Sequence, residues 1–118
     1  MSAQFDILIP EHTFSTQMFP SRVCNISERG AMAIIDLDPE IGALLLHKTR
    51  YCRICFSESE LPPKVQGRAV WIEPQKGAPP GKERYRIGIF FENVTDIDQV
   101  KLQTFVAAAL IRSKQRTP

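Results

Sequence analysis

The stretch Tyr85-Arg-Ile-Gly-Ile-Phe-Phe91 decides the fold class, because large apolar residues occupy every second position in it. In an extended strand, Tyr85, Ile87, Ile89 and Phe91 would all lie on one face. The same period of two appears on both sides of this stretch, and further strands are expected at residues 65–73, 51–57, 31–35, 22–26, 14–19 and 5–9. The sequence therefore predicts a mainly β protein.

The C-terminal segment has a helical period instead. Apolar residues recur at intervals of three and four between residues 96 and 114, and the stripe is Leu102, Phe105, Val106, Ala109 and Leu110. Thr95, three residues before Asp98, resembles a helix cap. A basic tail, residues 112–118, follows where positive charge suits the end of a helix. Several short strands and one such helix indicate a closed or nearly closed barrel with the helix packed on it. Residues 39–47 fit either a helical turn or a buried strand.

Length and charge limit the classes of function that the chain can have. A chain of 118 residues fits one domain, expected to span residues 1–118. The net charge of +2 argues against a strongly basic nucleic-acid binder, so DNA is not an expected partner. No apolar run approaches the ~20 residues that span a bilayer, so no membrane insertion is expected. The N-terminal residues lack the pattern of a signal peptide, which predicts a cytoplasmic protein.

The sequence shows no pattern of a metal centre or of an enzyme. Cys52 and Cys55 form a CxxC motif, but residues three apart in a strand point to opposite faces and cannot hold one metal ion. Cys24 stands apart from them. The chain has neither a phosphate-binding glycine-rich motif nor a serine in the context of a nucleophile elbow. We therefore expect no enzyme activity, no metal and no cofactor.

One connection between two expected strands carries residues suited to binding. It has the form Asn-x-Ser-x-x-Gly at Asn25, Ser27 and Gly30. The Asn and Ser side chains can hydrogen-bond an anion or a base edge, or their own backbone. Gly30 permits a positive φ and a close backbone approach. Arg29 and Arg22 would add planar cations suited to phosphate and guanine. A ligand site and a plain turn both fit this pattern.

The order of motifs along the chain resembles the PilZ domain family. Asn-x-Ser-x-x-Gly is followed by Gly67-Arg-Ala-Val-Trp71, by Tyr85-Arg-Ile-Gly-Ile-Phe-Phe-Glu-Asn93 and by an amphipathic helix, so the resemblance covers residues 14–111. It implies a six-stranded β-barrel with one C-terminal helix and, as in many members, a bacterial receptor for the second messenger cyclic di-GMP. The resemblance also implies that Asn25, Ser27 and Gly30 wrap that ligand.

Trp71 has two interpretations. An exposed indole would stack on a guanine of the ligand. Its position in line with Val65 and Ala69 favours a place in the barrel core instead. We therefore regard Trp71 only as a candidate contact for the ligand.

The sequence departs from the family in one respect. PilZ receptors carry an RxxxR pair just before the first barrel strand, but residues 1–21 contain no Arg or Lys. Either the chain is a piece cut downstream of that arm, or the domain keeps the fold and half of the site. Two functions remain open: a cyclic di-GMP receptor with weak binding that signals to a protein partner or neighbouring domain, and a nucleotide-independent adaptor acting by protein–protein contacts in motility, pilus or envelope assembly.

Overall fold

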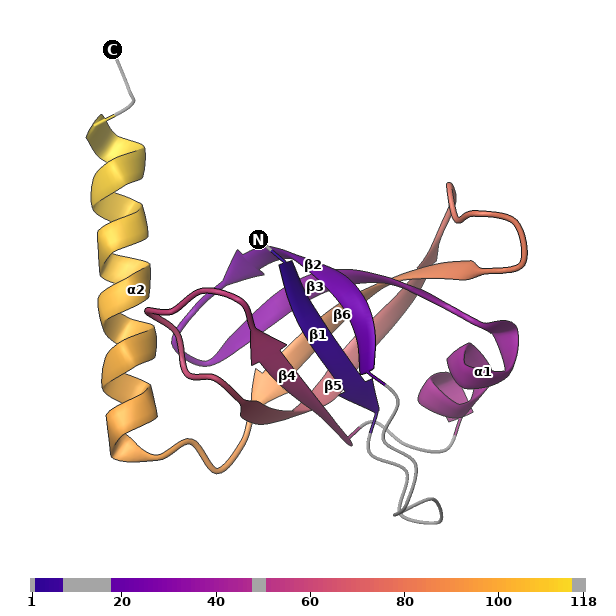
Figure 1. Ribbon diagram of the computed structural model, residues 1–118, viewed down its shortest axis with the longest axis horizontal. Coiled ribbons are helices and arrows are strands. Elements are labelled where there is room, and N and C mark those ends of the chain that lie inside the picture. Colours follow the sequence, from indigo (N-terminus) through magenta and orange to yellow (C-terminus); the bar gives the residue numbers. More distant parts are fainter. Residues whose placement is uncertain (1, 8–17, 48–50, 116–118) are drawn as a thin grey trace.

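Antiparallel strands close into a barrel in the order β1-β2-β3-β6-β5-β4 (Figure 1). The structure, a computed structural model, describes residues 2–7, 18–47 and 51–115. Within these residues the six strands are β1 (Ser2–Ile7), β2 (Met18–Ile26), β3 (Gly30–Leu37), β4 (Tyr51–Phe56), β5 (Val65–Gln75) and β6 (Glu83–Phe91). β1 pairs with β2 on one side and with β4 on the other, and this closes the barrel. The predicted six-stranded β-barrel is confirmed.

The barrel interior follows the predicted alternation. In β6 the side chains of Tyr85, Ile87, Ile89 and Phe91 are all buried. β3 places small residues opposite the large ones of β6, since Ala31 pairs with Ile89 and Ala33 with Ile87. Large side chains facing small ones across neighbouring strands fill a narrow barrel without overlap.

Some elements begin or end at other residues than the sequence predicts. Residues 18–19 belong to the same strand as residues 22–26, whereas residues 8–17, which complete the expected strands 5–9 and 14–19, lie outside the described residues. Residues 39–47, which fitted either a helical turn or a buried strand, form a helix, α1 (Pro39–His47). It lies at the end of the barrel away from the C-terminal helix (Figure 1). A Cβ added at Gly42 of α1 would collide with the ring of Tyr85, so α1 lies directly against the barrel core.

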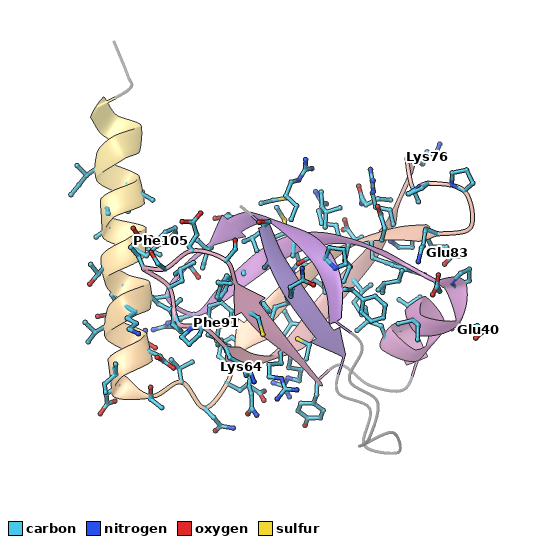
Figure 2. The ribbon with its side chains drawn as sticks, in the orientation of Figure 1. Glu40, Lys64, Lys76, Glu83, Phe91 and Phe105 are labelled. Carbon is cyan, nitrogen blue, oxygen red and sulfur yellow. The ribbon has the colours of Figure 1, made fainter. Side chains whose placement is uncertain are left out.

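The predicted C-terminal helix is observed as α2 (Asp96–Gln115). The hydroxyl of Thr95 accepts a hydrogen bond from the backbone N of Asp98 at 3.2 Å, which confirms the predicted cap. Leu102 is fully buried, and Phe105 is half-buried on the side of α2 that faces the barrel (Figure 2). Leu110 is 58% exposed, so the predicted apolar stripe is wrong at this residue.

Leu110 lines an open groove between α2 and β2 and does not pack against the barrel core. The helix continues beyond the end of the barrel, and its last turns have no described strand beside them (Figure 1). Side chains from residue 112 onward, including the expected basic tail, lie outside the described part of the structure.

The assignment of a strand to the CxxC motif is confirmed. Cys52 and Cys55 both lie in β4; Cys52 is fully buried, whereas Cys55 is partly exposed on the other face. Cys24, in β2, is exposed, and no disulfide joins the three cysteines. Among the described residues, no three side chains of His, Cys, Asp or Glu gather closely enough to hold a metal ion.

Candidate ligand-binding site

The connection between β2 and β3 is a tight turn held together by Ser27. Its backbone N donates to the carbonyl oxygen of Gly30 at 2.8 Å. Its hydroxyl oxygen accepts from the backbone N of Arg29 at 3.3 Å and from that of Gly30 at 3.2 Å. Serine side chains commonly fix turns through such local bonds. Ser27 therefore shapes the turn, which carries Arg29 and directly follows the end of β2 with Asn25.

Two other elements fix the position of this turn. The backbone N of Phe91, at the end of β6, donates to the carbonyl oxygen of Arg29 at 2.8 Å. The side-chain amide of Gln99, in the first turns of α2, donates to the carbonyl oxygen of Glu28 at 3.4 Å. The turn is thus tied both to the barrel and to the C-terminal helix.

Gly30 is required by packing. A Cβ at this position would collide with the carbonyl oxygen of Ile89 on the neighbouring strand β6. Its φ is not in the left-handed region, which among the described glycines only Gly77 and Gly81 adopt. Gly30 therefore does not use the positive φ that glycine permits, and the close approach that it allows here is to the backbone of β6.

A pocket of about 380 Å³ opens beside the turn on the outer surface of the barrel. The turn and the outer faces of β3, β5 and β6 line it. The pocket brings together five of the residues predicted from sequence, namely Asn25, Ser27, Arg29, Gly30 and Trp71. It does not include Arg22, which lies farther along β2 opposite Ile34. The volume lies within the range of about 300–1,000 Å³ typical of small-molecule sites.

Trp71 reaches the pocket because of a β-bulge. The pairing of β5 with β6 shifts between Ala69 and Trp71, so that Val70 is an extra residue in β5. An inserted residue reverses the faces that follow it. Ala69 remains buried, whereas Trp71 turns outward and is 38% exposed. The alternative that placed Trp71 in the core with Val65 and Ala69 is thus wrong.

The indole of Trp71 lies against the backbone of Gly88, its partner on β6. A Cβ at residue 88 would overlap the indole ring, so glycine leaves the space that the ring occupies. The guanidinium carbon of Arg86 is 5.7 Å from the ring centroid, within reach of a cation–π contact. A nitrogen of Arg86 is also 2.5 Å from a carboxylate oxygen of Glu73. These neighbours hold Trp71 at the edge of the pocket.

Arg29 is the cation best placed for an anionic ligand. Its side chain is exposed in the turn and forms no ion pair with the residues that the structure describes. In contrast, Arg86 is paired with Glu73, and Arg68 with Glu92 at 3.3 Å. A guanidinium, an amide side chain and an aromatic ring around one open pocket suit a ligand with phosphate and base groups.

Sequence reasoning missed several apolar residues of the pocket, including Met32, Val70 and Phe90. The outward position of Phe90 follows from the alternation of β6, because it lies between the buried residues Ile89 and Phe91. No pattern in the sequence indicated the outward position of Val70, since that position depends on the bulge.

No helix within the described residues is long and apolar enough to cross a membrane.

Comparison with curated proteins found no match to this chain. Among solved structures, the chain is similar to the PlzA protein of Borreliella burgdorferi, crystallised in complex with cyclic di-GMP. The TM-score is 0.52 at 14% sequence identity, and the match covers 99% of this chain but only 46% of PlzA. This similarity concerns the fold.

The family comparison covers most of the sequence. The sequence profile of the PilZ domain matches residues 3–108, which include all of β1 except Ser2, the other five strands, the turn with its pocket and the buried part of α2. The chain therefore belongs to the PilZ domain family.

Proposed function

We propose that residues 1–118 form a single PilZ domain that acts as a receptor module for cyclic di-GMP, with the pocket beside the 27–30 turn as its site. The observation that supports this most strongly is the arrangement of Asn25, Ser27, Arg29, Gly30 and Trp71 around one open pocket. PilZ domains are non-catalytic modules that bind cyclic di-GMP. PlzA, which has a similar fold, was crystallised with this nucleotide.

Each residue has a distinct role in this proposal. The Asn25 amide hydrogen-bonds a guanine edge or a phosphate oxygen. Ser27 and Gly30 keep the turn in the shape that presents its groups to the ligand. Arg29 provides a guanidinium for a phosphate, and Trp71 provides a flat surface for a guanine base. Arg22, outside the pocket, meets only a ligand that extends along β2.

We expect the affinity to be low. Family members clamp the ligand with an RxxxR pair, and residues 1–21 have no Arg or Lys. A hydrogen bond to a charged group contributes about 1.5–3 kcal/mol, so losing both arginines removes several kcal/mol. Since 1.4 kcal/mol corresponds to a factor of ten, a micromolar receptor would become roughly millimolar or weaker.

Calorimetric titration of the chain with cyclic di-GMP tests the proposal. Weak, saturable binding is expected, and Asn25→Ala combined with Arg29→Ala should abolish it. Ser59→Ala, an exposed serine far from the turn in sequence, serves as the control and should leave binding unchanged. Binding that survives the double substitution would contradict this site.

A second titration tests whether the lack of an RxxxR pair explains the low affinity. A variant with an RxxxR segment joined before Ser2 should bind more tightly, and the gain should shrink as salt is raised, because the new contacts are between charges. The same extension with glutamine in place of both arginines is the matched control. Equal affinity of the two extended variants would contradict the explanation for weak binding.

One observation favours a second function, a nucleotide-independent adaptor. Val70, Trp71 and Phe90 form an exposed apolar surface around the same pocket. Exposed apolar side chains grouped in this way are typical of protein-binding surfaces. Absence of any nucleotide binding, also in the variant with the arginine arm, would favour the adaptor. In either function we place the domain in the bacterial cytoplasm, where it acts on a protein partner or a neighbouring domain.

A further inference from the structure

α2 has two apolar faces, and the barrel covers only one of them. Leu102 is fully buried against the barrel, and Phe105 packs against the same core. On the other side, Ile97, Val100 and Ile111 are 72%, 60% and 57% exposed. Figure 1 shows no other described element along that outer side of the helix. Large apolar side chains grouped on an open face indicate an interaction surface.

The exposed face has the spacing of a coiled-coil seam. Its members are separated by three, four, three and four residues and are Ile97, Val100, Thr104, Ala107 and Ile111. These intervals keep one side of a helix turned toward a second helix over successive turns. In heptad terms, Ile97, Thr104 and Ile111 are at position a, where β-branched residues favour two-stranded pairing.

The barrel leaves room for a second helix on this side. In the same heptad, Leu102 and Ala109 are both at position f, opposite the seam. Leu102 is buried against the barrel, and Ala109 lines a groove between α2 and β2. A helix docked on the seam would therefore lie on the side of α2 away from these two residues. α2 is already ordered by its packing, so pairing need not include the costly nucleation of a helix.

We propose that this seam pairs with the same seam of a second copy of the chain, with the two α2 helices parallel. The proposal is independent of the ligand pocket. The two barrels would lie on the outer sides of the helix pair, related by a two-fold axis along it. A dimer of this kind buries the same residues in both copies, as two-fold interfaces do.

The charges beside the seam determine the direction of pairing. Asp96 is at position g and Lys101 at position e. In a parallel pair, a residue at g meets the residue five positions later, at e, in the other helix. Asp96 of each copy would then meet Lys101 of the other, giving two ion pairs. Both residues are exposed, and neither forms an ion pair with any residue that the structure describes.

Sedimentation equilibrium of the full chain over a range of concentrations tests the pairing. We expect a reversible monomer–dimer equilibrium, since the seam is only two heptads long and includes the polar Thr104. Val100→Lys should weaken dimerisation at least about tenfold, a change of about 1.4 kcal/mol. Ala43→Lys, at an exposed residue of the other helix, α1, is the control and should leave the dimer unchanged. A chain that stays monomeric up to its solubility limit, or a dimer unaffected by Val100→Lys, would overturn the proposal.

A charge exchange tests the parallel direction. Asp96→Lys and Lys101→Asp should each weaken self-association, because each places like charges together across the interface. An equimolar mixture of the two variants should form a heterodimer, since both cross-pairs then have opposite charges. Circular dichroism of each variant checks that α2 remains folded. A mixture that associates no better than the separate variants would overturn the parallel arrangement.

Discussion

Trp71 and Gly88 face each other across β5 and β6, and the indole occupies the space where a side chain at residue 88 would stand. The bulge at Val70 turns Trp71 outward, and the absence of a Cβ at Gly88 lets the ring lie close to the sheet. Each of these features would be ineffective without the other. Together they place an aromatic surface beside the turn that carries Asn25 and Arg29.

Gly88→Ala should displace the indole. The added methyl group overlaps the ring, and overpacking of this kind costs about 1–3 kcal/mol. Trp71 is the single tryptophan of the chain, so its fluorescence reports the displacement directly. In a Trp71→Ala background the same glycine substitution should cost much less, because the overlapping group is gone. Equal costs in the two backgrounds would show that the ring does not determine the need for glycine.

Leu102 and Leu110 offer a matched pair on α2. Leu102 is fully buried, and its replacement by alanine should lower the free energy of unfolding by about 2–5 kcal/mol. Leu110→Ala removes the same atoms from an exposed position and should change stability by about 0.5 kcal/mol or less. Denaturant unfolding at low protein concentration measures both. Similar effects of the two substitutions would contradict the described orientation of α2.

The phenol of Tyr85 should ionise only in strong alkali. Its burial, followed by the hydrogen bond that its hydroxyl donates to the Glu83 carboxylate, raises the pKa of Tyr85 to about 12. In a Tyr51→Phe variant, Tyr85 is the single remaining tyrosine, and its ultraviolet titration should have a midpoint near that value.

The same shift affects stability. A pKa raised in the folded state means that the contribution of Tyr85 is complete below about pH 10 and is lost as the pH rises toward 12. Tyr85→Phe should remove this part of the alkaline loss of stability. A midpoint near pH 10 in a protein that is still folded would refute the burial of the hydroxyl.

The three cysteines should react in the order of their exposure. Cys24 is exposed, Cys55 is partly exposed and Cys52 is fully buried. A thiol reagent added to the native protein should therefore modify Cys24 first and reach Cys52 only after unfolding. Mass spectrometry of peptides taken during the reaction gives the order, and Cys24→Ser should remove the fast phase. Early modification of Cys52 would be incompatible with its position inside the barrel.

The fold was largely predictable because strands and helices leave different periods in the sequence. The alternation in β6 identified its buried residues, and the three- and four-residue spacing in α2 identified Leu102. α1 remained ambiguous because its short apolar run has no distinct period. Its place depends on the contact of Gly42 with Tyr85, which brings together residues far apart in the sequence.

The candidate site was predictable only where its chemistry is local. Asn25, Ser27 and Gly30 form a recognisable turn, and that turn lines the pocket. The face of Trp71 was not predictable, since a bulge arises from the pairing of β5 with β6 and not from the residues of β5 alone. The need for glycine at residue 30 was not predictable either, because it is set by the carbonyl of Ile89 on another strand.

The pairing of β1 on both of its sides has a consequence for aggregation. Because the described barrel is closed, none of its six strands offers a free edge to which a strand of another molecule can add. β1 is also one of the shortest strands and alone joins β2 to β4. Its release would leave two free edges at once while most of the core stayed in place. Local opening at β1, well before global unfolding, is therefore the step that would make this protein prone to self-assembly through its sheet.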